Sequence, residues 1–460
     1  MHFRKANACI AAFFTALITL PGSGHSLTLQ EAVLAASVYD SEISAARNAQ
    51  RADRQKRLQG FASLLPVVSL NGSYSKQDQP HMAYGRAVTR HNYSLNLTQP
   101  LFDVAKYADW KRGDAQADYA DVTLMQAEQQ LIARVAEAYF NVNYQRDVLS
   151  SAISAKSAYR QQLQQTQVAL RVGEGTRLER DEAQANYDRA VADEIAAKND
   201  LEEAGMVFSR LTGISADEIQ PIALACLLRS PLSADTRDLQ LRAGLNNLNV
   251  RAALLQLEHT NADVTAAHGA HLPVVTLQAS YGSNWSKTEN SNLFDWLLGS
   301  TSKTRSSNIG INVAVPLFAG GAQISRSIEA VRRREQGRDL LEDARRKARQ
   351  EARSAWLKLK NGQSQYLAEK KALASAKNKV SSTAYGREVG LRSIIDELNA
   401  EQEYYKTLRT LAKVQYDYLN ARLALSMALG EVDYSLLQQF NCAADNADYP
   451  LEAQGRKSHE

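Results

Sequence analysis

The sequence predicts a mainly α-helical fold with a β-barrel part, built from two tandem helix–strand–strand–helix repeats. Three observations support this prediction. Several short motifs occur twice in the same order, four short segments alternate apolar and polar side chains, and long stretches almost without proline or glycine carry apolar residues at a three-four spacing. Period-two alternation indicates strands, whereas the three-four spacing indicates amphipathic helices that pack as coiled coils.

Composition agrees with a chain of long helices. The 460 residues exceed the usual size of one compact domain, so a repeat or two domains is expected. Apolar residues make up 44% and charged residues 23%, but aromatic residues only 7%. This balance suits solvated amphipathic helices better than a thick aromatic core. A net charge of +4 is small for such a chain, so no nucleic-acid partner is expected.

The N-terminus has the pattern of a secretory signal peptide at residues 1–26. Arg4 and Lys5 precede an apolar run at 10–20, and small residues follow up to Ser26. The run is too short to span a bilayer, which takes about 20 apolar residues. We therefore expect an exported chain that is cleaved near Ser26. No later stretch is apolar enough for a transmembrane helix, so strands must form any membrane-crossing part.

Four landmarks reveal the internal repeat. They are Leu65-Pro66-Val67-Val68 and Leu272-Pro273-Val274-Val275, Pro100-Leu101-Phe102 and Pro316-Leu317-Phe318, Val172-Gly173 and Val389-Gly390, and Leu211-Thr212-Gly213 and Ala428-Leu429-Gly430. Their order is kept, and the offset between copies grows only from 207 to 217 residues. Chance would not preserve four landmarks in this way, so the repeat is real.

The landmarks divide the mature chain into two repeats and two further segments. Repeat 1 covers 27–213, with strands at about 64–77 and 91–101 and helices at about 28–62, 103–171 and 176–212. Residues 214–236 form an equatorial connection. Repeat 2 covers 237–430, with strands at about 272–285 and 307–317, and residues 431–460 form a C-terminal equatorial tail. The connection and the tail are expected to meet near mid-height of the long helices.

Each strand segment has one apolar and one polar face. A half-buried sheet over a soluble core would show the same alternation, but four segments of this length in an exported chain favour lipid-facing barrel strands. Four strands cannot close a barrel, since small barrels need about eight. An open sheet edge in lipid would leave backbone groups unpaired. The barrel must therefore be shared between chains.

The chain resembles the TolC family of outer-membrane channel-tunnels in four features. They are the repeated unit, its Leu-Pro entry into the first strand, its Pro-Leu-Phe exit from the second strand and its Val-Gly helix turns. The resemblance covers essentially the whole mature chain. It implies a homotrimer in the outer membrane, surrounded by lipid, whose shared twelve-stranded barrel is continued by an α-helical tunnel in the periplasm.

The same resemblance implies a function and its partners. Such channels are exit ducts for type I protein secretion and multidrug efflux, and they dock with a periplasmic adaptor and an inner-membrane ABC transporter or proton-coupled pump. The sequence does not identify which cargo is transported or which pump is the partner. An alternative from another class is a non-pore periplasmic coiled-coil structural protein, which explains the helices but not the four strands.

A periplasmic gate is implied near the second Val-Gly turn. The family's constriction usually carries an Arg and two Asp one helical turn apart, and Arg392 and Asp396 fit this pattern. Asn399 stands where the second acid is usual, so whether the gate has one acidic ring or two stays open. Arg387 stands where a gating tyrosine is common, and Glu179 matches an acidic residue of the facing hairpin, where it could pair with Arg392.

Two helix turns are implied as adaptor-docking sites. Val172-Gly173 and Val389-Gly390 match the turns at the tips of the family's periplasmic hairpins.

Cys226 and Cys442 are the two cysteines that remain after removal of residues 1–26. One lies in the connection and the other in the tail. An oxidising compartment permits a disulfide between them, and two free thiols are the alternative.

No feature of the sequence indicates an enzyme, a cofactor or a metal site. His268 and His271 lack a third ligand, and the segment 299–304 lacks the glycine of a phosphate loop before its lysine. No hydrolase or dinucleotide motif is present.

Overall fold

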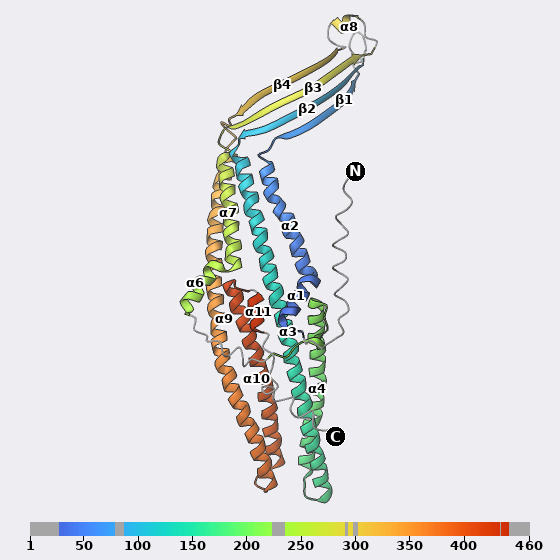
Figure 1. The fold of residues 1–460 in the computed structure, drawn as a ribbon, viewed down its shortest axis with the longest axis vertical. Helices are drawn as coiled ribbons and strands as arrows, with labels where there is room; N and C mark the ends of the chain where they lie inside the picture. The colour runs from blue at the N-terminus through green and yellow to red at the C-terminus, as the bar shows by residue number, and fades with distance from the viewer. Residues whose placement is uncertain are drawn as a thin grey trace, which may run out of the picture. The chain divides into compact units, whose positions relative to one another are not determined.

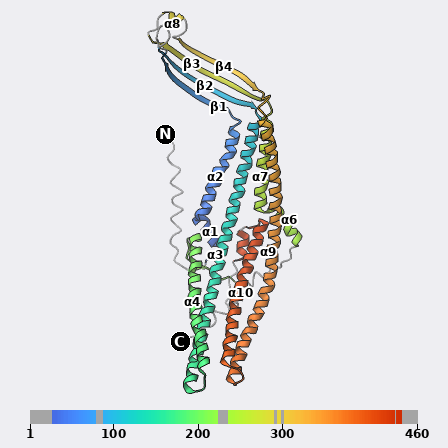
Figure 2. The same ribbon diagram turned by 180° about the vertical axis from the view of Figure 1, so that it is seen from behind.

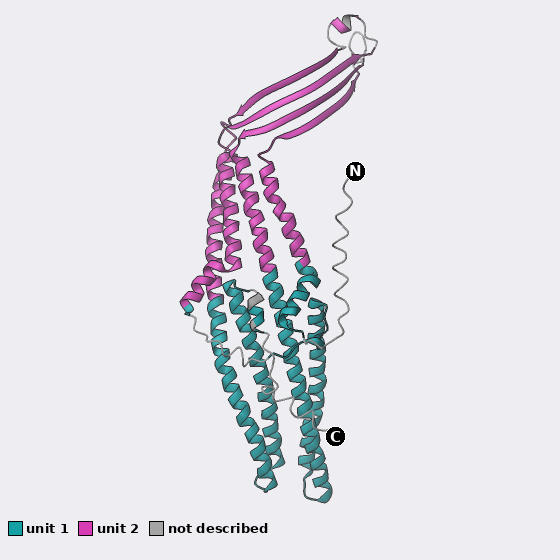
Figure 3. Cartoon of the chain, viewed as in Figure 1, with its two compact units in different colours: residues 1–43, 128–236, 352–460 teal, residues 44–127, 237–351 magenta. Residues whose placement is uncertain are grey.

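The computed structural model describes residues 27–78, 87–222, 235–289, 293–297, 302–432 and 434–440. The signal segment 1–26 and both Cys226 and Cys442 lie outside the described residues, so cleavage and the disulfide stay predictions. The chain divides into two compact units, shown in Figure 3: unit 1 with residues 1–43, 128–236 and 352–460, and unit 2 with residues 44–127 and 237–351. Each unit takes segments from both repeats.

A four-stranded antiparallel sheet in the order β1-β2-β3-β4 dominates one end of unit 2 (Figure 1). The strands are β1 (Val67–Gln77), β2 (Val88–Phe102), β3 (Val274–Thr288) and β4 (Ser302–Ala314). Pairing of β2 with β3 joins the two repeats in one sheet. β4 starts five residues before the expected position, because its ladder with β3 continues to the pair Ser286 and Ser302.

Long helices make up most of the remaining described chain (Figures 1 and 2). They are α1 (Leu29–Tyr39), α2 (Ser41–Ala62), α3 (Val104–Val172), α4 (Arg177–Thr212), α6 (Thr236–Asn246), α7 (Leu248–Gly269), α9 (Ala322–Glu388) and α10 (Ile394–Leu429), with the short elements η1 (Ala216–Glu218), α8 (Leu293–Leu297) and α11 (Tyr434–Gln439). No helix among the described residues is long and apolar enough to cross a membrane.

The helix expected at 28–62 is interrupted at one residue. Asp40 has an extended backbone, with φ −67° and ψ 122°, and it ends α1. Its side chain accepts a hydrogen bond from the backbone N–H of Glu42 at 2.9 Å. The aspartate therefore begins α2 as it ends α1, because short polar side chains satisfy the free donors of a new helix.

The core of unit 1 gathers aromatic side chains from several helices. Tyr139 of α3 packs edge-to-face against Phe208 of α4, with ring centroids 6.2 Å apart. Phe140 lies 5.6 Å from Phe440, just after α11. Leu27 forms an isolated parallel bridge with Ile219, so this core also holds the start of the described chain.

In unit 2, α2 and α3 are held together by ion pairs. Arg57 contacts Asp114 at 2.7 Å and Asp118 at 2.6 Å, and Arg54 contacts Asp121 at 3.0 Å. These side chains are largely exposed, so each pair contributes about 0–1 kcal/mol. Their spacing along both helices fixes the register of the two helices that lead to the sheet.

Candidate functional site

One face of the sheet is apolar along all four strands. The register aligns Val68, Leu97, Ala279 and Ile309 in a single row across the sheet. The next residues on this face are also mostly apolar, namely Leu70, Leu95, Tyr281, Tyr93, Leu277, Ile311, Val275 and Val313. Most of these side chains are exposed, and Ile309 reaches 74%. A contiguous exposed apolar face of this kind marks contact with lipid or a partner.

The opposite face is polar. One row across it contains Ser69, Asn96, Ser280 and Asn308, and the next contains Asn71, Ser94, Gly282 and Ser306. An apolar wall paired with a polar wall is the pattern of transmembrane barrel strands, whose inner surface faces water. The sheet therefore has the chemistry of a fragment of a water-filled barrel.

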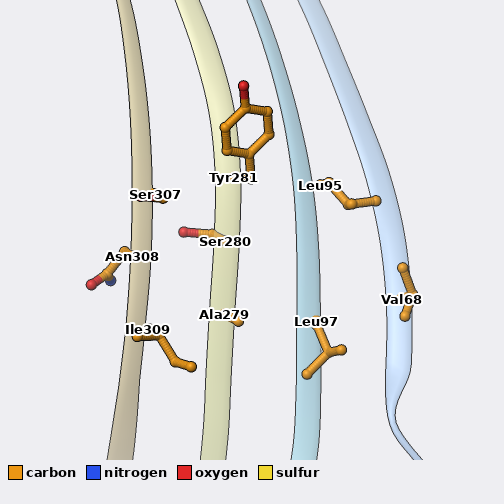
Figure 4. A pocket seen from close by; sticks show the side chains of 9 residues that line it. All are labelled: Val68, Leu95, Leu97, Ala279, Ser280, Tyr281, Ser307, Asn308 and Ile309. Atoms are coloured by element: carbon orange, nitrogen blue, oxygen red, sulfur yellow. The ribbon is translucent and has the colours of Figure 1, made fainter.

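A groove of about 490 Å³ lies against the sheet (Figure 4). Its lining comes from all four strands: Val68, Leu95, Leu97, Ala279, Ser280, Tyr281, Ser307, Asn308 and Ile309. The small side chains Ala279 and Ser307 sit on the same face as the larger Leu97 and Tyr281, so they leave the space of the groove. Its walls are mainly apolar, which suits an alkyl chain better than a polar ligand.

The two tip turns have the same local structure. α3 ends at Val172 and is followed by Gly173 with φ 83°, whereas α9 is followed by Val389 and by Gly390 with φ 75°. Positive φ favours glycine, which explains the glycine of each Val-Gly pair. Val172 is 63% exposed and Leu391 81% exposed, so both turns present apolar side chains to solvent.

Both implied gate acids lie in capping boxes. The Glu179 carboxylate accepts the backbone N–H of Thr176 at 2.8 Å, and the Asp396 carboxylate accepts that of Ser393 at 3.0 Å. The hydrogen bond from the Ser393 backbone is the main cause that lowers the pKa of Asp396, with a smaller contribution from the Arg392 charge. Asp396 therefore stays ionised at neutral pH.

Within this single chain Arg392 and Glu179 form no ion pair, and their pairing in the assembled gate stays a prediction. Glu179 is engaged by Thr176, and the Arg392 backbone N–H donates to the Gly386 carbonyl oxygen at 3.1 Å. Arg392 and Asn399 are exposed on the surface of the hairpin. The structure thus brings Arg392 near Asp396 on one hairpin but does not join it to Glu179.

Arg387 has a partner that sequence reasoning missed. It forms an ion pair with Glu397 of α10, whose side chain is only 12% exposed. Glu401 lies one turn further along α10, where burial raises its pKa to about 7 and the Glu397 charge adds to the effect, while Arg387 opposes it. Two acids four residues apart share one helix face, and this spacing is the signal that could have found them.

A seam within unit 1 joins the α3–α4 hairpin to α10. Gln402 donates to the Asn186 side-chain oxygen at 2.7 Å, and Arg409 lies 3.7 Å from Asp193. Between these contacts, Tyr159 and Tyr405 meet edge-to-face with ring centroids 6.2 Å apart. A cavity of about 200 Å³ remains beside these side chains. Polar and aromatic contacts therefore hold the two hairpins together.

Comparison with known proteins agrees with this geometry. The model of the family described as "Outer membrane efflux protein" matches residues 35–213 and again 241–431. The alkaline protease secretion protein AprF of Pseudomonas aeruginosa is 29% identical over 92% of this chain and 88% of its own length. The outer membrane protein TolC of Escherichia coli is 29% identical over 83% of this chain and 77% of its own length.

Solved structures share the fold. The outer membrane protein VceC of Vibrio cholerae aligns with a TM-score of 0.74 at 17% identity, covering 87% of this chain and 96% of VceC. The CmeC outer membrane channel of Campylobacter jejuni aligns with a TM-score of 0.73 at 18% identity, covering 90% of this chain and 89% of CmeC. The double family match and the amphipathic four-stranded sheet lead to one conclusion: this chain belongs to the outer membrane efflux protein family.

Proposed function

We propose that the chain is the outer-membrane exit duct of a type I protein secretion or drug efflux system and works as a homotrimer. In this arrangement three four-stranded sheets close one barrel, and the helices extend into the periplasm. A periplasmic adaptor connects the duct to an inner-membrane transporter, either an ABC transporter or a proton-coupled pump.

The observation that carries this proposal is the exposed apolar face that continues across all four strands. Val68, Leu97 and Ile309 share one row of it, and their side chains have no covering layer among the described residues. In the described sheet, β1 and β4 are the edges. An edge in lipid leaves N–H and C=O groups unpaired at several kcal/mol each, so edge pairing between copies follows.

The periplasmic gate belongs to the same proposal. A threefold axis would place three Asp396 carboxylates at one level, and acidic rings of this kind select cations in other pores. Each Asp396 is held in place by its capping box with Ser393, which fixes the position of the charge. The exposed turns at Val172-Gly173 and Val389-Gly390 serve as docking points for the adaptor.

The names of the relatives favour protein export as the first cargo to test. AprF is an alkaline protease secretion protein, and PrtF of Dickeya chrysanthemi, 26% identical over 93% of this chain, is a proteases secretion protein. BepC of Brucella suis, 25% identical over 88% of this chain, is an outer membrane efflux protein. We therefore propose a polypeptide as the primary cargo and drugs as the second candidate.

The test is the single-channel conductance of the detergent-purified oligomer in planar lipid bilayers. Discrete conductance steps support the duct. An oligomer that inserts without conducting, or a monomer seen by light scattering, supports the alternative of a non-pore coiled-coil protein. For the cargo, a deletion strain that loses a secreted polypeptide from the medium supports secretion. A strain that only gains drug sensitivity supports efflux.

A further inference from the structure

Four basic side chains interrupt the apolar face of the sheet at its loop end. The register places Lys76, Lys287, Lys303 and Arg305 on the same face as Val68 and Ile309, but nearer the strand ends that lead into the loops. All four are exposed. Within the described part of the chain none of them forms an ion pair, so their charges are available to a ligand.

An aromatic row lies between these cations. Tyr74, His91 and Trp285 occupy neighbouring strands at one level of the same face. The rings of Tyr74 and His91 meet edge-to-face at 4.9 Å, and those of His91 and Trp285 at 4.7 Å. Lys303 pairs with Trp285 in the ladder, so the last aromatic residue and the first cation are direct neighbours. Aromatic rings with both apolar and polar parts favour the interface between lipid tails and headgroups.

The spacing of these rows matches one bilayer core. Ten residues of β3 separate Val275, at the helix end of the apolar face, from Trp285. Ten residues of strand extend about 33 Å, and a strand tilted by about 40° in a barrel rises about 25 Å over that length. This is the height of the apolar band of an outer-membrane barrel. Lys76 and Lys287 then stand at headgroup level, Lys303 lies in the row of Trp285, and Arg305 lies one row below it. The long side chain of Arg305 can bring its guanidinium group up to the headgroups.

The groove whose lining Figure 4 shows begins one row further from the loops than Arg305. Ser307 and Tyr281 line it, and the next row toward the loops contains Arg305. Successive residues on one face of a strand lie about 7 Å apart. An alkyl chain in the groove would therefore start directly below the guanidinium group of Arg305.

We propose that this surface binds a phosphorylated glycolipid of the outer leaflet, with its phosphates on Lys303, Arg305 and Lys287 and one acyl chain in the groove. This inference rests on the proposed duct, which directs the strand ends with the loops away from the helices and thus to the outer leaflet. Two cations two residues apart on β4 match a lipid with more than one phosphate. A lipid with one weak negative charge or none satisfies only part of the site.

The experiment uses the full-length oligomer in phosphatidylethanolamine vesicles, with or without diphosphoryl lipid A as the added probe. Lipid retained after detergent washing is measured by mass spectrometry for the original protein and for the double variant Lys303→Gln, Arg305→Gln. Each basic side chain near an anionic headgroup strengthens the binding of the lipid. We therefore expect the double variant to retain lipid A about thirtyfold more weakly than the original protein. Added salt should weaken lipid A binding to the original protein, because the contact is electrostatic.

The matched control is Arg90→Gln. Arg90 lies at the same level on β2, but on the polar face, where it donates to the Gln77 side-chain oxygen at 3.1 Å. Its replacement should leave lipid A retention unchanged. Equal retention by the double variant, or equal binding of phosphatidylglycerol in place of lipid A, overturns the proposal.

The same preparations are also tested for conductance in planar bilayers. Channels that conduct but do not retain lipid A contradict only this inference. If the original protein does not conduct, the result contradicts the proposed duct itself.

Discussion

Glu179 and Asp396 occupy the same position in two equivalent capping boxes, one at the start of α4 and the other at the start of α10. Each carboxylate accepts the backbone N–H of the residue three positions earlier, at 2.8 Å and 3.0 Å respectively. An acid at this position satisfies a donor that the helix itself leaves unpaired. The carboxylate proposed for the gate is therefore also a structural part of its helix.

Replacing Asp396 by Asn separates these two roles. The change removes one negative charge from every chain, so we expect weaker cation selectivity. The weakened cap should cost little stability, because Asn is also a good partner for the free donors at a helix start. Reversal potentials in planar bilayers under a salt gradient measure the selectivity. Asp396→Glu keeps the charge and should keep the selectivity.

The control for this charge change is Glu203→Gln, which removes an exposed carboxylate of α4. It should not alter the reversal potential. If Asp396→Asn has no more effect than this control, Asp396 is a capping residue without a part in selectivity.

Glu401 should make the stability of the hairpins depend on pH. Its pKa is raised from 4.5 to about 7, mainly by burial, so the folded chain favours the protonated form. This contribution to stability is complete below pH 4.5 and is lost as the pH rises through about 7. Glu401→Gln should therefore raise the free energy of unfolding by about 1–2 kcal/mol above neutral pH, after allowance for solvent screening.

Thermal unfolding followed by circular dichroism at acidic and alkaline pH tests this expectation. Glu403→Gln is the matched control, because Glu403 is exposed on the same helix. A melting temperature of the original protein that does not fall between mildly acidic and alkaline pH would be evidence against it.

Tyr139→Phe should loosen the start of the described chain at Leu27. The buried phenol oxygen lies 2.9 Å from the Leu27 carbonyl oxygen and 2.8 Å from that of Gln220, and its proton is shared between them. Losing the hydroxyl removes one donor from these carbonyls, while the Leu27 carbonyl oxygen keeps the Gln220 backbone N–H at 3.0 Å and the Gln220 carbonyl oxygen keeps the Asn143 side chain at 3.5 Å. The expected cost is therefore that of a lost hydrogen bond, about 0.5–1.5 kcal/mol. Faster amide hydrogen exchange near Leu27 and a lower melting temperature are expected. Tyr385→Phe, at a side chain that is 67% exposed, should change neither.

Gly390→Ala should strain the second tip turn. Gly390 has φ 75°, and an added Cβ would meet nothing within 4 Å, so only the backbone penalty of about 1–2 kcal/mol remains. We expect a small loss of stability and weaker capture of the purified adaptor in a pull-down assay. Gly310→Ala in β4 has equal space and no positive φ, so it is the control. Unchanged adaptor capture by Gly390→Ala would argue against this turn as a docking point.

The repeat, the strands and the long helices could be predicted from the sequence because each is a local pattern. Alternation in 68–74 and in 275–281 identified faces that the ladder then placed on one side of the sheet. The helix break at Asp40 was missed, since an aspartate within an amphipathic stretch is compatible with both a surface position and a cap.

The gate residues show the limit of this approach. Their positions came from a resemblance, and the sequence alone could not reveal that Arg387 pairs with Glu397 or that Glu401 is buried. The ion pair and the burial depend on how α9 packs against α10. The spacing of residues along one helix does not determine this packing.

The sequence by itself determined that this chain has two copies of one unit, four amphipathic strands and two glycine turns, because periodicity and backbone conformation are properties of short segments. Only the tertiary structure decided which strands are neighbours and which charges meet. Pairing of β2 with β3 joins segments almost two hundred residues apart, and it adds Trp285 to the row that Tyr74 and His91 form through the pairing of β1 with β2. Burial and electrostatics arise from such contacts between distant segments, so they appear only when the chain is folded.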